Sequence, residues 1–587
     1  MQEQVPLEEH AAEEKLNWLR LATKFSSDGD LKGMRACAQE VERLKAGDVD
    51  AAAVNAEVAL YSGRTDEAET LADQVLRVQP RHPRARIVKA GLAALDFRLD
   101  DEIALLADLI EELSYKEKLL GAEDLSYTIY HQILRRARGW LADALYLVGE
   151  AKGAAHELLM SSRLADDDSV AAELYSKYLF MRNYRQLGAQ EGRQKAEHYE
   201  ELLHVTPYTH AHIARSSQRK LRIGYISPDF REHAVSYFIP PLLRHFDGEH
   251  FMVFCYALGR SDAVTERFRT RRVTWRDLRG RPPRTAARLI AEDKIDILVD
   301  LSGHSQDNAL PIMAYRPAPV QVSGIGYTNT TGLHTVDYFL SDEVCIPKGD
   351  TLAEKGFTEK ILRLPHSHLC YAPEAVRVMP EAGCEPPVRR NGYVTFGSFN
   401  NFAKVTDEIL LLWRGILESV RGSRLIIKGK IASIDSGVGF AKKRLSMLNY
   451  DLSRVEFRPY SPDYLEQYRD IDIALDTAPY NGGLTTCEAL YMGVPVISLR
   501  GRTHGARFGA SILTNAGVRE LVAENDINYV RRAVQLAESP KLLEAYHAGL
   551  RANMRRSPLM NVKGYMEELE TAYQEIWEHY CAINPLG

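Results

Sequence analysis

The sequence lacks most features that mark membrane, secreted and zinc-binding proteins. It has no apolar run near 18 residues, and its first ten residues are acidic rather than basic and then apolar. We therefore expect neither a membrane anchor nor a signal peptide. The seven cysteines show no C-x-x-C spacing, which argues against a zinc cluster and against a disulfide framework. These absences predict a cytoplasmic protein in a reducing compartment, without a metal site.

A strong charge of either sign is also missing. The chain has 74 Lys and Arg against 80 Asp and Glu, for a net charge of −6, so we expect no general attraction to nucleic acid. Its 587 residues, 45% hydrophobic and 26% charged, are ordinary for a protein of about three or four domains. Any anion that this protein binds is therefore expected to be small.

Residues 1–210 are expected to form an α-helical domain, because short Gly/Asp turns recur there and β-branched runs are almost absent. The clearest unit is residues 50–82, where Gly63 marks a turn and small Ala68 lets two helices approach. This spacing is typical of a degenerate tetratricopeptide repeat, whose period is about 34 residues. A generic helical bundle is the alternative, and either fold offers a surface rather than chemistry. Weaker copies are expected at residues 145–158 and 18–44.

From Leu221 onward, apolar strands alternate with helices. This pattern predicts two doubly wound α/β domains with parallel sheets and a cleft between them. We place the first domain at residues 220–385 and the second at 386–560, and we expect a final helix, within 561–587, to pack back on the first domain. The expected strands are residues 221–227, 251–256, 295–301, 320–325, 336–340, 393–396, 424–428, 454–457, 472–475 and 494–498.

The segment from Tyr480 to Pro495 places a glycine turn, two threonines and a carboxylate at the start of an apolar helix between two strands. The unpaired N–H groups and the dipole of such a helix N-terminus attract anions. We therefore expect an anionic ligand beside Thr485 and Thr486. The alternative is that both threonines only cap the helix.

Further candidates follow other strands, because ligands of open α/β sheets lie outside the carboxyl ends of the strands. Lys404 could stabilise a phosphate held by the glycine turn, although a surface lysine near a helix cap is an equal alternative. His233 could be a general base or a solvated loop histidine, and His304 is interpreted in the same way. The D-x-D triplet at residues 470–472 we interpret as a chance match rather than a metal site.

Taken in order, these motifs resemble those of the O-GlcNAc transferase family, including its SPINDLY-like branch. These protein O-glycosyltransferases join tetratricopeptide repeats to a GT-B catalytic core. The resemblance runs from Leu221 to Tyr580, and the N-terminal repeats fit the same family with fewer copies. The matching elements include Tyr225-Ile-Ser-Pro-Asp-Phe-Arg-Glu-His233, Phe396-Gly-Ser-Phe-Asn-Asn-Phe-Ala-Lys404 and residues 254–257, 297–304, 316–321, 326–332, 475–477, 480–495 and 557–559.

The resemblance implies an inverting, metal-independent transfer of a sugar from a nucleotide sugar to a Ser or Thr hydroxyl of an acceptor protein, with no other cofactor. Lys404 matches the essential lysine on the donor diphosphate. His233 matches a histidine near the acceptor and sugar, and we expect it to position groups rather than to transfer a proton. The expected donor-binding residues are Asn401 beside the lysine, Tyr464 at the base, Gly482, Gly483, Leu484, Thr485 and Thr486 at the phosphates, and Glu488 at the ribose.

Two departures from the family pattern concern the donor. Where the animal enzyme reads Asn-Gly-His-Thr-Thr, this chain has Asn481-Gly-Gly-Leu-Thr-Thr486, and Tyr464 replaces a histidine that stacks on uracil. Residues 303–304 and 329–332 are more similar to the SPINDLY branch, which includes O-fucosyltransferases that use GDP-fucose.

We therefore expect UDP-GlcNAc as the donor, with GDP-fucose as the alternative. Two further alternatives are Asn N-glucosylation from UDP-glucose and an inactive repeat scaffold that only binds. Acceptor proteins are expected to bind through the repeats and the cleft, with no nucleic acid or membrane partner.

Overall fold

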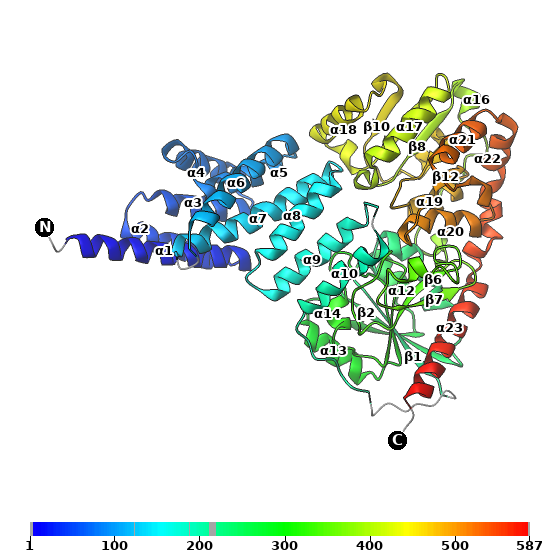
Figure 1. Ribbon diagram of the computed structural model, residues 1–587, viewed down its shortest axis with the longest axis horizontal. Coiled ribbons are helices and arrows are strands. Elements are labelled where there is room, and N and C mark those ends of the chain that lie inside the picture. Colours follow the sequence, from blue (N-terminus) through cyan, green and yellow to red (C-terminus); the bar gives the residue numbers. More distant parts are fainter. Residues whose placement is uncertain (1–3, 122–123, 187, 211–218, 585–587) are drawn as a thin grey trace. The chain divides into compact units, whose positions relative to one another are not determined.

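A computed structural model describes residues 4–121, 124–186, 188–210 and 219–584 (Figure 1). The chain divides into two compact units. The helical unit comprises Met1–Tyr178 and Ile434–Phe440, and the α/β unit comprises Leu179–Ser433 and Ala441–Gly587. Among the described residues, no helix is both long and apolar enough to cross a membrane.

The helical unit is built from antiparallel helix pairs, in which α1 packs on α2, α3 on α4, α5 on α6 and α7 on α8. Three of the connecting turns contain a glycine with positive φ, namely Gly29 (72°), Gly63 (73°) and Gly149 (84°), a conformation that glycine adopts without strain. The turns at the predicted repeats are confirmed, and Ala68 is fully buried. The first ten helices are α1 Gln4–Asp28, α2 Leu31–Leu44, α3 Val49–Tyr61, α4 Thr65–Val78, α5 Pro83–Leu95, α6 Leu99–Leu119, α7 Leu125–Leu147, α8 Ala151–Arg163, α9 Asp168–Arg182 and α10 Ala189–Glu201.

The pair formed by α5 and α6 was missed by the sequence analysis, because its turn has no glycine. Phe97 occupies the equivalent position with a φ of 54°. A left-handed conformation is unusual for a residue with a large side chain. A pattern that searches for glycine therefore undercounts the repeats.

A charged cluster lies inside the helical unit and joins four helices. The Glu57 carboxylate is 1% exposed, accepts a hydrogen bond of 2.6 Å from Ser26 Oγ, and pairs with the guanidinium groups of Arg84 and Arg136. Burial alone would raise the pKa of Glu57, but the two arginines lower it to about 2. The core of the repeats therefore depends on a charge that must stay paired.

Two parallel sheets form the α/β unit, as the sequence predicts. Their strand orders are β3-β2-β1-β4-β5-β6-β7 and β10-β9-β8-β11-β12-β13. The order reverses between β1 and β4 in the first sheet and between β8 and β11 in the second, and such points are where doubly wound sheets bind ligands. The strands are β1 Leu221–Ser227, β2 Phe251–Ala257, β3 Val273–Asp277, β4 Ile297–Asp300, β5 Val320–Ser323, β6 Tyr338–Asp342, β7 Lys360–Leu364, β8 Thr395–Ser398, β9 Arg424–Lys428, β10 Val455–Arg458, β11 Ile473–Leu475, β12 Val496–Leu499 and β13 Val522–Ala523.

Three of these strands, β3, β7 and β13, do not appear among the expected strands. All three lie at sheet edges, where one side of a strand faces solvent and polar residues are tolerated. β3 reads Val-Thr-Trp-Arg-Asp and β7 reads Lys-Ile-Leu-Arg-Leu, while β13 has two residues. Neither length nor apolar continuity distinguished them from loops.

The last helix, α23 (red in Figure 1), packs on β5 and β7 of the first sheet and on helix α11. Its buried face includes Tyr573 and Trp577, and the guanidinium of Arg219 lies 5.3 Å from the Trp577 ring centre. The helices of the α/β segment are α11 Pro240–Arg244, α12 Ala263–Phe268, α13 Pro283–Glu292, α14 Leu310–Met313, α15 Thr351–Glu354, α16 Val388–Asn391, α17 Asp407–Ser419, α18 Asp435–Met447, α19 Leu484–Tyr491, α20 Phe508–Asn515, α21 Asp526–Ala537, α22 Pro540–Arg555 and α23 Val562–Ile583.

Candidate functional site

The glycine turn connects β11 to α19 at the point where the order of the second sheet reverses. A buried carboxylate, Asp476, shapes this turn. It accepts hydrogen bonds from Gly482 N (2.7 Å), Thr477 N (2.8 Å) and Ser498 Oγ (2.6 Å). The sequence analysis gave Asp476 no role, although an acidic residue at the carboxyl end of an apolar strand was the available signal.

Lys404 reaches this turn from the loop that follows β8. Its Nζ donates to the main-chain oxygen of Asn481 at 3.2 Å and lies 4.2 Å from the ring centre of Tyr480. The side chain is half-buried, and this burial lowers the pKa of the ammonium to about 8, against the opposing attraction of Asp476. The structure thus brings Lys404 and the glycine turn together, and only part of the lysine side chain is open to solvent.

Thr485 and Thr486 lie in the first turn of α19. Thr485 Oγ1 donates to Asn400 Oδ1 at 2.9 Å, and Thr486 Oγ1 donates to the Gly482 carbonyl at 2.9 Å. The N-cap is Gly483, which supplies no side-chain cap. The alternative that the two threonines only cap the helix is therefore wrong.

Two neighbouring asparagines have different contacts in the loop after β8. The Asn401 side chain accepts a hydrogen bond from Ala403 N at 3.1 Å and so caps the short helix Phe402–Lys404. Asn400, to which the sequence analysis gave no role, connects this loop to Thr485. A small pocket is lined by residues from the ends of β8 and β11 and from the start of α19, including Asn400, Asp476 and Thr485.

Glu488 and Tyr464 form a pair farther along α19. The Tyr464 hydroxyl donates to Glu488 Oε1 at 2.5 Å, and burial raises the pKa of this carboxyl to about 7. Arg377, which the sequence analysis missed, holds its guanidinium 5.6 Å from the Tyr464 ring centre. Leu484 is half-buried against the core. These groups place an aromatic ring, a cation and a buried acid beside one another.

His233 lies after β1, where the first sheet reverses its order. It caps the short helix Ala234–Tyr237, because its Nδ1 accepts from Val235 N at 3.4 Å. Burial, with a further contribution from Arg231, lowers the pKa of His233 to about 4, so the imidazole is neutral at pH 7. The capped helix packs against α19. The structure therefore brings the His233 segment to the helix that begins at the glycine turn.

His304 is not a solvated loop histidine, and that expectation is wrong. Its side chain is 1% exposed, and its Nε2 donates to the Thr331 carbonyl at 2.8 Å. The rings of Tyr199 and Tyr327 pack edge-on against it. This histidine stabilises the loop after β5.

The two carboxylates of the D-x-D triplet bind partners within the protein. Asp470 pairs with Arg390 and Arg458 at 2.8 and 2.7 Å. Asp472 accepts hydrogen bonds from Val388 N and Thr395 N. The triplet therefore holds the second sheet to its neighbouring segments.

Residues 173–374 and 389–569 match the profile of the family described as Glycosyl transferase family 41. An Arabidopsis thaliana protein named probable UDP-N-acetylglucosamine–peptide N-acetylglucosaminyltransferase SPINDLY is 43% identical over 384 residues, which are 64% of this chain and 41% of that protein. The Arabidopsis protein SEC, named for the same activity, is 27% identical over 382 residues, 62% of this chain and 38% of its own length. The chain thus matches less than half the length of these curated relatives.

The fold also matches a solved structure of a mutant O-GlcNAc transferase from Thermobaculum terrenum. The two chains share 26% sequence identity with a TM-score of 0.69. The match covers 98% of this chain and 99% of the other. Helical repeats followed by two Rossmann-like sheets are therefore an architecture that this chain shares with an O-GlcNAc transferase.

Proposed function

Because the chain belongs to glycosyltransferase family 41, we propose that it transfers a sugar from a nucleotide sugar to a side chain of an acceptor protein. One observation carries the proposal: the Lys404 ammonium is held at the glycine turn, beside the N-terminus of α19. A fixed cation next to unpaired helix N–H groups is suited to a diphosphate. The division into a repeat domain (1–210), an acceptor lobe (220–385), a nucleotide lobe (386–560) and a final helix (561–587) is part of this proposal.

The reaction would be a direct displacement at the anomeric carbon. The acceptor hydroxyl forms a bond to that carbon while the bond to the diphosphate oxygen breaks, which inverts the configuration, and the hydroxyl proton leaves to a general base. Lys404 and the first turn of α19 stabilise the negative charge on the departing diphosphate. His233, neutral at pH 7, would orient the acceptor and the sugar.

The remaining site residues would hold the nucleotide. Thr485, Thr486 and the glycines Gly482 and Gly483 would face the phosphates, with Asn401 beside them. Tyr464 would stack on the base. Its ring already lies beside the Arg377 guanidinium and stacks on the ring of Tyr460. The buried Glu488 carboxyl would accept a hydrogen bond from a ribose hydroxyl.

UDP-GlcNAc is the proposed donor, since both Arabidopsis relatives are named for it. GDP-fucose is the second candidate, because residues 303–304 and 329–332 are more similar to the SPINDLY branch, and because Gly483 and Leu484 depart from the family pattern at the phosphates. Ser or Thr is the proposed acceptor residue. Transfer of glucose from UDP-glucose to Asn is the remaining enzymatic alternative.

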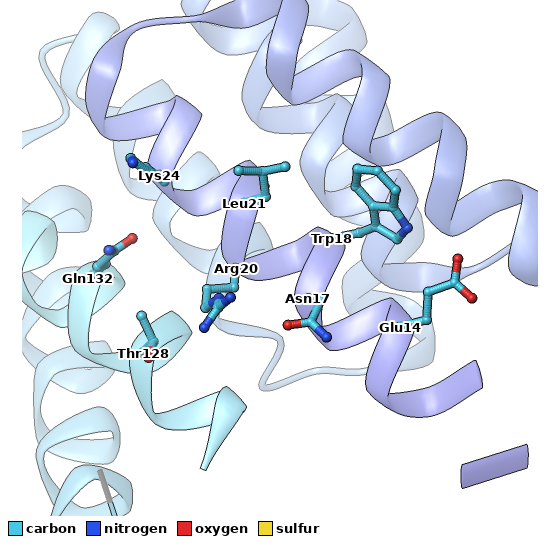
Figure 2. A pocket seen from close by; sticks show the side chains of 8 residues that line it. All are labelled: Glu14, Asn17, Trp18, Arg20, Leu21, Lys24, Thr128 and Gln132. Carbon is cyan, nitrogen blue, oxygen red and sulfur yellow. The ribbon is translucent and has the colours of Figure 1, made fainter. Parts of the chain in front are cut away.

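The helical unit would bind acceptor proteins. It contains a hollow of about 660 Å³ between α1 and α7 (Figure 2). Apolar Trp18 and Leu21 lie there beside the amides of Asn17 and Gln132. Such a mixed lining suits an extended peptide, whose main chain offers donors and acceptors.

The proposed function is tested by presenting UDP-GlcNAc, GDP-fucose and UDP-glucose separately to the purified chain. Titration calorimetry measures donor binding, and donor hydrolysis by water provides a readout that needs no acceptor. Mass spectrometry of modified peptides then locates the sugar. We expect UDP-GlcNAc to bind at least about tenfold more tightly than the others, a difference of about 1.4 kcal/mol. If none of the three binds, the chain is an inactive scaffold and the proposal is wrong.

Replacing Gly482 by Ala is expected to weaken UDP binding at least about tenfold, whereas Gly483→Ala should change it less than about twofold. A Cβ on Gly482 would lie 2.5 Å from Thr485 Oγ1 and 2.8 Å from Thr486 Oγ1, so both threonines would have to move. A Cβ on Gly483 meets no atom within 4 Å. Calorimetry with UDP on both variants makes the comparison, and equal affinities would show that the close packing at Gly482 is irrelevant to the nucleotide.

A further inference from the structure

Three buried metal-ligating side chains meet outside the proposed donor site. Cys345 follows β6, His368 follows β7 and His504 follows β12, and their ligand atoms all lie within 4.8 Å of one another. Cys345 and His368 are fully buried, and His504 is 2% exposed. Two segments of the first sheet and one of the second thus contribute to a single cluster.

Three ring nitrogens of this cluster lack a hydrogen bond of ordinary geometry. They are the Nε2 of His368 and the two ring nitrogens of His504, all buried; the main chain of Thr328 makes only a small electrostatic contribution at His504. A buried polar atom without a partner costs about 1–3 kcal/mol, so three in one place indicate a missing ligand. The rings of Phe339 and Phe508 pack against His504 at 5.1 and 5.3 Å. Such an apolar wall gives a water molecule few of the polar partners that it needs.

We propose that Cys345, His368 and His504 bind one zinc ion. One thiolate and two imidazoles are ligands that favour zinc. His368 also has the outer partner typical of zinc-bound histidines, because its Nδ1 donates to Asp342 Oδ2 at 2.5 Å. That hydrogen bond places the proton on Nδ1 and leaves the Nε2 lone pair for the metal.

Charge and proton balance support the site. Zinc brings two positive charges, and the Cys345 thiolate and the Asp342 carboxylate bring two negative ones, so the buried group is neutral overall. When the metal binds, the bond from Cys345 Sγ to its proton is replaced by a bond to zinc, and the proton leaves to solvent. No oxidant or reductant takes part.

The distances permit coordination after a small contraction. Zinc–ligand bonds of about 2.0–2.3 Å place the donor atoms of a tetrahedron roughly 3.3–3.7 Å apart, so ligand atoms that lie within 4.8 Å of one another would have to approach by at most about 1.5 Å. The Arg507 carbonyl oxygen accepts a hydrogen bond from Cys345 Sγ at 3.6 Å, and once the thiol has lost its proton this oxygen would be the nearest candidate for the fourth position.

This zinc would be structural rather than catalytic. It would join loops of both sheets. His504 is followed by Gly505, whose carbonyl accepts a hydrogen bond of 3.2 Å from Asn481 N. The Asn481 carbonyl in turn accepts a hydrogen bond from Lys404, so the zinc would lie next to the donor site. The sequence analysis expected no metal, since residues 345, 368 and 504 are far apart in the chain. Cysteine spacing could not reveal a site assembled by the fold.

Metal analysis of the untagged full chain, purified without chelator, tests the proposal. We expect about one zinc per chain by plasma mass spectrometry, and loss of that zinc in Cys345→Ser and in His504→Gln. Cys255→Ser, which alters an equally buried cysteine in β2, should keep its zinc. Cobalt substitution should give thiolate-to-cobalt absorption that Cys345→Ser lacks.

Two results would overturn the zinc site: less than about 0.1 zinc per wild-type chain after incubation with zinc chloride, or full zinc content in Cys345→Ser. Binding of copper alone would also exclude it. If the variants do not fold, the test uses the wild-type chain. A strong chelator should remove one zinc from it and lower its melting temperature, because the metal stabilises the folded state. These readouts need no transfer activity, so they stay separate from the test of the proposed function.

Discussion

Replacing Lys404 by Met is expected to lower kcat for sugar transfer by about 10³-fold, a loss of about 4 kcal/mol of transition-state stabilisation. The methionine keeps the length and apolar character of the side chain but removes the charge that Asn481 O and the Tyr480 ring hold in place. The substituted chain should keep its fold, since the lysine is only half-buried. Single-turnover kinetics with a saturating donor measures the effect.

The matched control is Lys541→Met, at an exposed position of α22 in the same lobe. Its kcat should stay within about twofold of wild type, because exposed substitutions away from a site have small effects. Circular dichroism of both variants checks the fold. Wild-type turnover by a folded Lys404→Met chain would remove this lysine from the mechanism.

The same lysine is expected to set an alkaline limit on activity. Burial lowers the pKa of the Lys404 ammonium to about 8, so the charged form is complete at lower pH and is lost as the pH rises through that value. We expect kcat/KM for the donor to fall above about pH 8. Lys404→Arg should retain a flat profile there, because a guanidinium stays protonated.

Replacing Glu57 by Ala is expected to destabilise the helical unit by about 3–5 kcal/mol, because it leaves Arg84 and Arg136 buried without their counter-charge. The effect should be local to the repeats, since Ser26, Arg84 and Arg136 come from α1, α5 and α7. Hydrogen exchange resolved by helix measures the loss, because a chain of several domains does not unfold in two states.

Glu67→Ala provides the comparison, because Glu67 forms an exposed pair with Arg64 at 2.6 Å and should cost less than about 1 kcal/mol. Acid gives a second check. The pKa of Glu57 is lowered from 4.5 to about 2, so its stabilisation is complete above pH 4.5 and disappears as the pH falls toward 2. A Glu57→Ala chain that kept wild-type protection would show that the cluster adds no net stability.

The sequence predicted those parts of the molecule that depend on local pattern. Glycine turns at Gly63 and Gly149 marked the helix pairs, and continuous apolar strands marked the interiors of both sheets. The loop of Lys404 and the glycine turn could be paired in advance because parallel strands end at a common edge. Contacts between residues of neighbouring loops at that edge could therefore be predicted from the order of the strands.

Two kinds of feature could not be predicted from the sequence. One kind depends on contacts between segments that are distant in the chain, and the other is a turn formed by a residue type that seldom forms one. Phe97 takes a backbone conformation that its side chain disfavours, so it gave no turn signal. Asp476 and Asn400 hold the glycine turn through hydrogen bonds that need the folded loop. Glu57 is a charged residue in the core of the helical unit. Its burial can be understood only from the positions of Arg84 and Arg136 in the folded structure.

The packing of α23 on the first sheet has a consequence for the order in which the chain can fold. Residues 562–583 are synthesised after both sheets, yet they cover a face of the sheet that begins at Leu221. Until they emerge from the ribosome, apolar side chains of that sheet stay open to solvent and to other nascent chains. The first sheet, although it begins early in the sequence, thus needs a helix that is synthesised after both sheets.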